Sequence, residues 1–584
     1  MHHMTTKARQ RQSFTKTVFQ AIIVILFLSL APPILAIYDP LSVPNNRFGM
    51  HIADLNDVPD VAPLVNSTGG DWGYVTLVAP QTDHNTSAWQ KLFDDMRRLH
   101  LIPIVRLATK PEGASWKKPS KGDIRDWVSF LTSLNWPTEN RYVVVFNEPN
   151  HAKEWGNTID PEGYADILVT FAKALKEANE DFFILPAGLD ASAASNGDSL
   201  DAAEYLKRMV SAKPELLDLI DGWTSHSYPN PGFSGSPYAW GRGTLWTFSW
   251  ELELLRSLGL KKSLPVFITE TGWTHSEGKF WQPRSLRPEG VGANLAIAAG
   301  SVWQDARIAA ITPFVFNYQD YPFDHFSFKQ LGNGEYYAHY ASYQAITKQQ
   351  SKPRQRESYE IDHPLLPEKL VAGSTYALQT KIKNTGQGIA DASQGYELVI
   401  EDSKGFAISD VSLPRLEPGQ RETLTFSLTT PNTPGVYPVK LIIRHNDNIA
   451  ILEAREITLI PPPTLVVQTH LGWKRTSNAK NAKVLVYDGH ELTHEFPDLA
   501  LIDGTAVTPG LTNITPGKRY RIVLVIPSFL PAQTSVAVKE TETLVRLPRL
   551  LPLDFDEDGA LTLSDVTTLL KLQPHAVLNR FFGK

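Results

Sequence analysis

Two glutamates stand at the ends of apolar segments in the first half of the chain. Glu148 lies in the motif Asn-Glu-Pro, and Glu270 lies in the motif Glu-Thr-Gly-Trp. Two facing carboxyl groups suit cleavage of a glycosidic bond, because one donates a proton to the leaving oxygen while the other, ionised, attacks the anomeric carbon. The pair therefore predicts glycoside chemistry by double displacement, provided that the fold holds the two groups about 5–5.5 Å apart.

Eight short apolar runs recur at a spacing of about 38 residues, (311 − 47)/7, with helical patterns between them. The runs are continuous, which is typical of strands buried on both faces of a parallel sheet. The pattern predicts an α/β fold, a TIM or (β/α)8 barrel, over residues 38–348. A doubly wound open sheet is the alternative, but no glycine-rich phosphate turn follows the first run. The runs are 47–53, 73–80, 102–109, 142–150, 182–190, 219–230, 264–273 and 311–320.

The barrel hypothesis places both glutamates at one face of the fold. In such barrels the catalytic side chains lie at the carboxyl ends of the strands. Glu148 ends the fourth run and Glu270 ends the seventh, 270 − 148 = 122 residues later. Because these two strands lie across the barrel mouth from each other, we expect the carboxyl groups to face one another over a cleft.

The two motifs, in this order and on these strands, resemble the large clan of retaining glycoside hydrolases with (β/α)8 barrels. The resemblance implies Glu148 as acid/base and Glu270 as nucleophile, with Asn147 bonded to the sugar 2-hydroxyl. The sixth run ends in His226-Ser227-Tyr228 and matches the clan's His-x-Tyr, which implies that Tyr228 orients the nucleophile. His226 and an arginine on the third run, Arg106, are the further site candidates.

Aromatic side chains are candidate platforms for sugar rings. The clan usually has a tryptophan at the end of strand eight, whereas this chain has Phe316 and Tyr318 there as possible substitutes. The loops after runs six and seven are long and rich in aromatic residues. From them we expect Trp240, Trp273 and Trp281 to contact the substrate.

The second half of the chain has the pattern of β-modules. A polar segment, 349–358, is predicted to be a linker. Short strands separated by turn signals then predict a β-sandwich over 359–460 and a second all-β module over 461–550, after a run of three prolines. The two modules share no obvious repeat.

The C-terminal segment 551–584 resembles one calcium repeat of a dockerin. Its acidic residues occupy positions 1, 3, 5 and 12 of an EF-hand-like loop, with Gly559 at position 6. The resemblance implies a structural Ca²⁺. Only 584 − 565 = 19 residues follow the loop and no second loop is visible, so the sequence does not favour a cohesin-like partner. The candidate ligands are Asp554, Asp556, Asp558 and Asp565.

Residues 1–37 are typical of an export segment. Basic residues precede an apolar stretch at 18–30 that ends at Pro32 and Pro33, which indicates a secretory signal peptide or an uncleaved membrane anchor. We therefore expect an extracytoplasmic protein, secreted or held at the outer face of a membrane.

Composition narrows the function classes. The net charge is only −6 and cysteine is absent, which disfavours a nucleic-acid partner and excludes thiol chemistry. The predicted reaction needs carboxyl groups and no cofactor. Two alternatives remain open: a non-catalytic glycan-binding or adhesion protein on the same scaffold, and a transglycosylase that uses the same residues.

Overall fold

The computed structural model describes residues 37–401, 405–446 and 448–571, and it divides them into two compact units with a boundary between Arg356 and Glu357. Nearly all of the predicted export segment, 1–37, lies outside the described residues. In the part that is described, no helix is long and apolar enough to cross a membrane.

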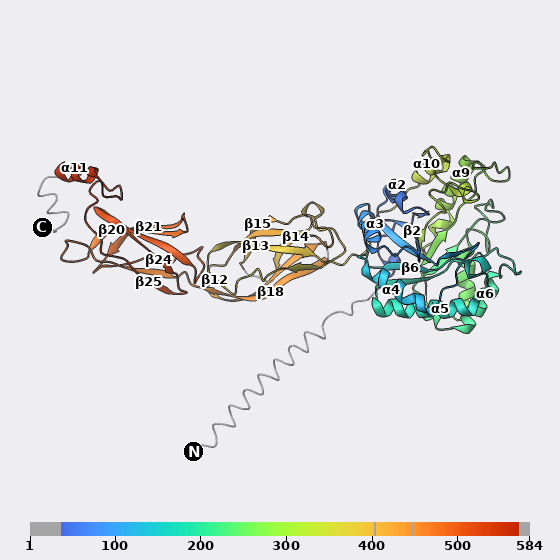
Figure 1. Ribbon diagram of the computed structural model, residues 1–584, viewed down its shortest axis with the longest axis horizontal. Helices are drawn as coiled ribbons and strands as arrows, with labels where there is room; N and C mark the ends of the chain where they lie inside the picture. The colour runs from blue at the N-terminus through green and yellow to red at the C-terminus, as the bar shows by residue number, and fades with distance from the viewer. Residues whose placement is uncertain (1–36, 402–404, 447, 572–584) are drawn as a thin grey trace, which may run out of the picture. The chain divides into compact units, whose positions relative to one another are not determined.

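Eight parallel strands form the first unit (Figure 1). Five pair in the order β1-β2-β3-β6-β7 and three in the order β10-β9-β8. Parallel bridges between Phe48 and Ile311 and between Asp190 and His226 join the two groups, so the sheet closes on itself. The predicted (β/α)8 barrel is thereby confirmed. Its strands are β1 (Gly49–Ile52), β2 (Gly73–Pro80), β3 (Leu101–Ala108), β6 (Arg141–Val145), β7 (Phe182–Pro186), β8 (Trp223–His226), β9 (Val266–Glu270) and β10 (Ile308–Ile311).

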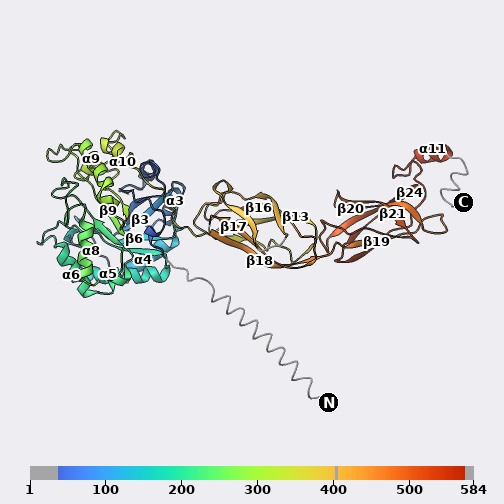
Figure 2. The ribbon, with the colours of Figure 1, turned by 180° about the vertical axis from the view of Figure 1, so that it is seen from behind.

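Helices follow the strands and cover the outside of the barrel (Figure 2). The longest of them starts at Pro161, and the side chain of the preceding Asp160 caps it by accepting a hydrogen bond from Gly163 N. A two-stranded hairpin, β4 (Pro111–Glu112) with β5 (Ser115–Trp116), extends the loop after β3. The helices are α2 (Val58–Val65), α3 (Thr86–Arg98), α4 (Ile124–Ser133), α5 (Pro161–Ala178), α6 (Ala202–Ala212), α7 (Leu216–Leu219), α8 (Thr247–Ser257), α9 (Pro288–Gly300) and α10 (Ala338–Gln344).

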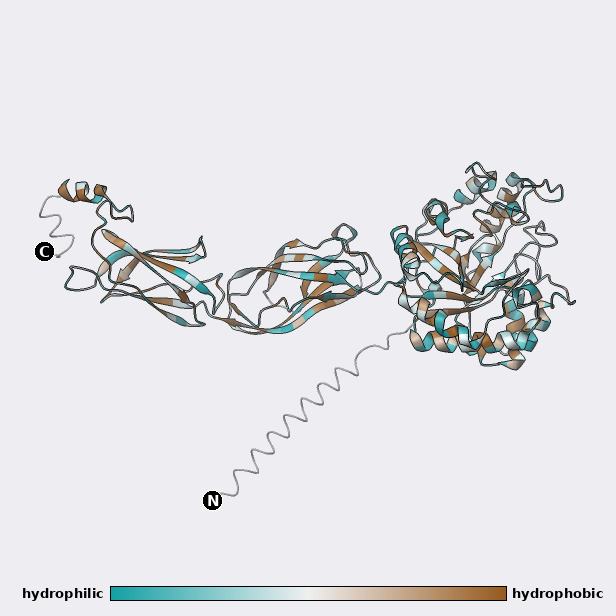
Figure 3. Cartoon of the chain, in the orientation of Figure 1, coloured by the Kyte–Doolittle hydropathy of each residue, from teal (hydrophilic) through white to brown (hydrophobic). Residues whose placement is uncertain are grey.

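Each barrel strand is buried on both faces. On β2, Val75 and Leu77 belong to the core between strands and helices, whereas Tyr74 belongs to a separate cluster that also holds Tyr142 and Phe267. The strands are therefore apolar on consecutive residues, and Figure 3 shows the centre of the barrel mostly in brown. This two-sided burial produces the continuous apolar runs of the sequence.

The eighth strand lies earlier than predicted. We expected it over 311–320, but β10 is Ile308–Ile311 and the chain then leaves the sheet. Residue Phe314, rather than Phe316, therefore follows the strand end, and Phe316 is fully buried in the core.

Much of the predicted linker 349–358 is hydrogen-bonded to the barrel. Ser351 N donates to Asp71 O (3.1 Å), and Glu139 N donates to Arg354 O (2.8 Å). The barrel unit therefore extends to Arg356, because the polar character of this segment reflects hydrogen bonds to the barrel rather than free solvation.

The second unit holds two β-sandwiches with separate cores. The first pairs the sheets β11-β13-β16-β15 and β12-β18-β17-β14, and the second pairs β22-β19-β25 and β21-β20-β23-β24. The helix α11 (Leu563–Lys571) follows them. The strands are β11 (Tyr359–Ile361), β12 (Lys369–Val371), β13 (Thr375–Asn384), β14 (Glu397–Glu401), β15 (Ala407–Ser412), β16 (Arg421–Thr429), β17 (Gly435–His445), β18 (Asn448–Ile460), β19 (Thr464–Gln468), β20 (Ala479–Asp488), β21 (Glu491–Leu501), β22 (Thr505–Val507), β23 (Arg519–Ile526), β24 (Phe529–Ala537) and β25 (Glu542–Arg546).

Candidate active site

A cleft of about 800 Å³ opens at the carboxyl ends of the barrel strands. Side chains from the ends of β1, β3, β6, β8 and β9 line it, and both Glu148 and Glu270 are among them. A cleft of this size, with a few converging polar groups, is the ordinary form of a small-molecule or glycan site.

The backbone that carries Glu148 is held in an unusual conformation. Phe146 (φ 72°) and Glu148 (φ 31°) are both in the left-handed region, which costs a non-glycine residue about 1–3 kcal/mol. Glu148 N donates to Gly188 O (3.1 Å), and His151 N donates to Glu148 O (2.9 Å). These bonds fix the turn that aims the Glu148 side chain into the cleft.

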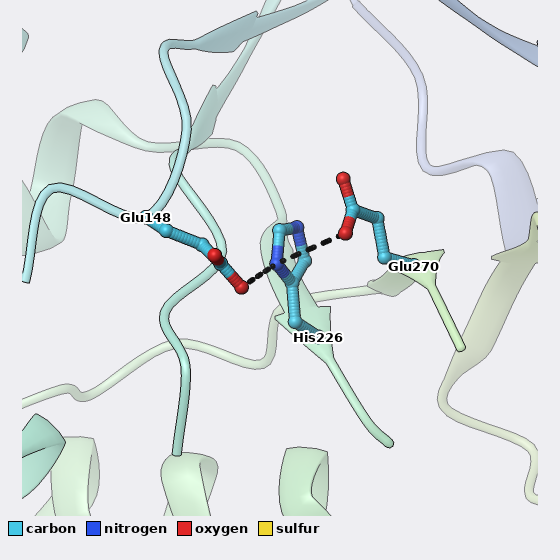
Figure 4. Close-up of side chains that lie close together, drawn as sticks. All are labelled: Glu148, His226 and Glu270. Atoms are coloured by element: carbon cyan, nitrogen blue, oxygen red, sulfur yellow. Dashed lines mark hydrogen bonds and ion pairs between the residues drawn. The ribbon is translucent and has the colours of Figure 1, made fainter. Parts of the chain in front are cut away.

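His226 stands between the two carboxyl groups (Figure 4). Its Nδ1 is 2.8 Å from Glu148 Oε1 and 3.7 Å from Glu270 Oε2. One oxygen of each glutamate and one nitrogen of His226 lie within 4.8 Å of one another. The two carboxyl groups are therefore close enough for double displacement, and closer than the 6.5–9.5 Å or so that leaves room for a water molecule between them.

Positive and polar groups surround Glu270. Arg106 Nη1 donates to Glu270 Oε1 (3.2 Å), and Tyr228 Oη donates to Oε2 (3.1 Å). Burial would raise the pKa of Glu270, but the charges of His226 and Arg106 and the bond from Tyr228 outweigh it and hold the pKa below its usual value. Glu270 is thus an ionised, oriented carboxylate, as a nucleophile must be.

Two histidines near Glu270 have pKa values that are shifted in opposite directions. Burial would lower the pKa of His226, but the negative charges of Glu270 and Glu148 outweigh it and raise the pKa above its usual value. His51, at the end of β1, has its Nε2 3.8 Å from Glu270 Oε1. Burial and the charge of Arg106 lower its pKa to about 3, so His51 is neutral. Sequence reasoning missed His51, because no motif surrounds it.

Asn147 also lies in the cleft, and its Oδ1 is buried without a hydrogen-bond partner among the described residues. Beside it is Glu154, which the sequence did not single out. Burial and the charge of Glu148 raise the pKa of Glu154. An unpaired buried amide oxygen is costly unless a ligand pairs with it, so Asn147 is a candidate acceptor for a substrate hydroxyl.

A second histidine–carboxylate pair lines the cleft after β6 and β7. His151 Nε2 lies 2.9 Å from Asp190 Oδ2, and this bond raises the pKa of His151. Asp190 ends the apolar run 182–190, but no pattern in the sequence indicates its partner His151.

The three predicted tryptophan platforms lie outside the cleft lining. Trp273 is only 2 % exposed and donates to Gly235 O (2.8 Å), so it packs the loop after β9. Trp240 is exposed and stacks on Trp246. Trp281 is exposed and is not a lining residue, although its neighbour Gln282 is. Contacts to other protein groups thus hold Trp240 and Trp273, and contact of the three rings with the substrate stays a prediction.

The cleft has aromatic rings from other positions instead. Phe314 follows β10 and packs edge-to-face on His51, with ring centroids 5.1 Å apart. Tyr318 lines the cleft as expected for a strand-eight substitute, whereas Phe316 does not. The displaced end of β10 explains why Phe314 takes the position expected for Phe316.

The acidic loop before α11 brings three of its four predicted ligands together. Oxygens of Asp554, Asp556 and Asp558 lie within 4.8 Å of one another, and Asp554 Oδ1 is buried without a partner. Asp565 instead accepts hydrogen bonds from Phe555 N (2.7 Å) and from Thr562 N. The loop therefore offers three carboxylates to a cation, and Asp565 closes the turn.

We expect Gly188→Ala to lower catalytic activity strongly while the barrel remains folded. A Cβ at this position would lie 2.3 Å from His226 Cδ2, so the imidazole must move. A displacement of about 1 Å can cost about 100-fold in rate, and kcat/KM should fall by that order. Gly197→Ala is the control, because a Cβ there meets open space. An unchanged kcat/KM for Gly188→Ala would show that catalysis does not depend on the position of the His226 ring.

Glu251 is buried on α8 behind the strand that carries His226, and its Oε2 accepts a hydrogen bond from Trp223 Nε1 (3.0 Å). Burial raises its pKa from 4.5 to about 7. The folded state therefore holds this proton more tightly than the unfolded state does. Stability is lost as pH rises from about 4.5 to about 7, and the full penalty remains above that range.

Glu251→Gln should remove this penalty. We expect a gain of about 3 kcal/mol in the free energy of unfolding at pH 8 and of about 1 kcal/mol or less at pH 5. Denaturant unfolding at both pH values measures it, with the exposed Glu253→Gln on the same helix as control. Equal effects of Glu251→Gln at the two pH values would show that Glu251 does not titrate in this range.

A family model matches part of the chain. The CARDB family matches residues 359–455, which span the first β-sandwich of the second unit. No curated protein matches the chain in sequence.

Several solved structures are similar to the chain at low identity. A family 39 glycoside hydrolase from Bacteroides cellulosilyticus WH2 is 13 % identical, with a TM-score of 0.37 over 67 % of this chain and 82 % of that one. An endo-β-1,4-glucanase from Xanthomonas axonopodis pv. citri is 13 % identical, with a TM-score of 0.35 over 52 % and 98 %. A β-mannanase from Thermomonospora fusca is 10 % identical, with a TM-score of 0.33 over 51 % and 87 %. These structural neighbours are glycoside hydrolases.

Proposed function

We propose that the protein is a retaining glycoside hydrolase that cleaves a poly- or oligosaccharide by double displacement. One observation carries the proposal: oxygens of Glu148 and Glu270 lie within 4.8 Å of each other, with His226 Nδ1 between them. Transglycosylation by the same residues differs only in the acceptor, which is a sugar rather than water.

In the first step Glu270 attacks the anomeric carbon, and the bond between that carbon and the leaving oxygen breaks. Arg106 and Tyr228 hold the attacking carboxylate in place. Glu148 gives its proton to the leaving oxygen, and the hydrogen bond to His226 orients the Glu148 side chain. The product of this step is a glycosyl ester on Glu270.

In the second step water attacks the same carbon and the ester bond to Glu270 breaks. Glu148, now ionised, takes the proton from that water, which returns both carboxyl groups to their starting state. Esterification removes the negative charge of Glu270, so a negative charge on the neighbouring carboxyl group meets less repulsion. His226 Nδ1 lies 2.8 Å from Glu148 Oε1 and 3.7 Å from Glu270 Oε2, so it contacts both reacting groups.

A glycan-binding protein on a barrel scaffold is the competing function. A panel of 2,4-dinitrophenyl glycosides and soluble polysaccharides separates the two. The proposal expects turnover of at least one member and its loss in Glu148→Ala. Binding without turnover, unchanged in Glu148→Ala, would favour the binding protein.

We extend the proposal to location and to metal. The basic and apolar pattern of residues 1–37 supports export, secreted or anchored at the outer face of a membrane. The loop of Asp554, Asp556 and Asp558 supports one structural Ca²⁺, because hard cations prefer carboxylate oxygens. Calorimetric titration of the chelator-treated full chain with Ca²⁺, beside Asp554→Asn, tests the site: heat of binding in both proteins, or in neither, would refute it.

A further inference from the structure

The two sides of the cleft differ in chemistry. Six rings, here called the aromatic wall, come from the loops after β8 and β10: Phe233, Phe314, Tyr318, Tyr321, Phe323 and Phe326. Polar side chains from the loops after β6 and β7 also line the cleft. Since β10 and β6 lie four strands apart in a ring of eight, the loop after β10 faces the loop after β6 across the barrel mouth.

The aromatic wall is continuous from the nucleophile outward. Next to Tyr228, which touches Glu270, comes Phe233, with ring centroids 4.9 Å apart. Further contacts join Phe233 to Phe326 (5.2 Å) and Phe326 to Phe314 (5.6 Å). The wall thus begins at the bond that would be cleaved and runs away from it.

The outer end of the wall is exposed. Phe314 contacts Phe323 (5.5 Å), which is 40 % exposed, and Tyr321 is 49 % exposed. By contrast Phe326, deeper in the cleft, is 6 % exposed. Exposed rings that continue a connected aromatic cluster at the edge of a cleft are typical of a surface that a ligand covers.

The charged side chains that line the cleft distinguish neutral sugars from acidic ones. Arg106 and Lys153 are its Lys and Arg residues, and Arg106 is bonded to Glu270. Four carboxyl groups, those of Glu148, Glu154, Asp190 and Glu270, also line the cleft. With Arg106 bonded to Glu270, Lys153 is the Lys or Arg side chain left in the lining to pair with an acidic sugar such as a uronate, so the lining favours neutral sugars. A neutral pyranose suits both sides, because its C–H face packs on aromatic rings while its hydroxyls meet polar groups.

We propose that Tyr321 and Phe323 form a distal subsite that binds a unit of a neutral polysaccharide beyond the unit that is attacked. This inference rests on the proposed function and names its substrate class. It makes the protein an enzyme of polymer chains, for which isolated monosaccharide glycosides fill only the inner part of the cleft.

The test compares polymer and monosaccharide substrates in Tyr321→Ala/Phe323→Ala. On the polysaccharide that the natural protein prefers among laminarin, barley β-glucan, galactomannan and xylan, kcat/KM should fall about 10- to 100-fold, mainly through KM. On 2,4-dinitrophenyl monoglycosides it should change less than about twofold, because the reacting groups are untouched. Tyr238→Ala, which removes another exposed ring of the barrel unit that is not among the lining residues, is the control. Equal changes on both substrate types, or a preference for polygalacturonate, would overturn the proposal.

Binding separates this inference from the proposed reaction. In affinity electrophoresis of Glu270→Gln with the same polysaccharides, retardation should depend on Tyr321 and Phe323 even without cleavage. If no glycoside is turned over but this retardation persists, the reaction is refuted and the subsite stands. If turnover is found but the retardation is the same with and without Tyr321 and Phe323, only the subsite is refuted.

Discussion

Glu270→Gln is expected to lower kcat by about 10⁴-fold or more while leaving the fold and substrate binding nearly intact. Glutamine keeps the size of the side chain and can still accept a hydrogen bond from Tyr228, but its amide cannot form the glycosyl ester. Steady-state kinetics on a dinitrophenyl glycoside measures the loss, and thermal unfolding monitors the fold. Burial of Glu270 with Arg106 and His226 makes its charge part of the cluster, so a modest change in melting temperature is also expected.

A matched replacement supplies the control for this loss. Glu154→Gln changes another carboxyl group of the same cleft, one that makes no contact with Glu270 among the described ion pairs and hydrogen bonds. It should retain far more activity than Glu270→Gln. Comparable losses in the two variants would contradict the assignment of the nucleophile to Glu270.

Glu148→Ala is expected to show a different pattern that identifies an acid/base. Without its proton, glycosides with poor leaving groups should react about 10²- to 10⁴-fold more slowly. Dinitrophenyl glycosides need little proton donation, so their first step should be much less affected and the glycosyl ester should accumulate. Added azide should then restore turnover by attacking that ester, because azide needs no general base.

The product of azide rescue reports the stereochemistry as well. A glycosyl azide with the same anomeric configuration as the substrate shows that the small nucleophile replaced water in the second step of a double displacement. Absence of rescue in Glu148→Ala, or a glycosyl azide of inverted configuration, would contradict the roles given to the two glutamates.

The sequence was most informative where burial imposes a pattern. Because strands such as β2 bury Tyr74 on one face and Val75 on the other, the apolar runs are continuous and recur with the barrel's period. The ordered motifs also led to Glu148, His226, Tyr228 and Glu270, which the structure brings to one end of one cleft. Strand-end position was sufficient for these, since parallel strands end on the same side.

The rest of the cleft depends on loop packing that no local pattern reveals. The loops after β9 and β10 are joined by His275 N, which donates to His325 O (2.8 Å). Such long-range bonds decide that Phe323 faces the cleft while Trp273 is buried and Trp240 stacks on its neighbour. All three residues are equally apolar in sequence, so their positions could not be distinguished there.

The assignment of Glu270 as nucleophile is tested most directly by mapping the covalent intermediate. The protein is incubated with dinitrophenyl 2-deoxy-2-fluoro glycosides of several sugars, which form the glycosyl ester faster than it is hydrolysed, and is then analysed by intact mass and peptide mapping. We expect a single adduct on the peptide that contains Glu270, absent from Glu270→Gln and still formed in Glu148→Ala. An adduct on another residue, or turnover of the parent glycosides with inversion and no adduct, would contradict this assignment.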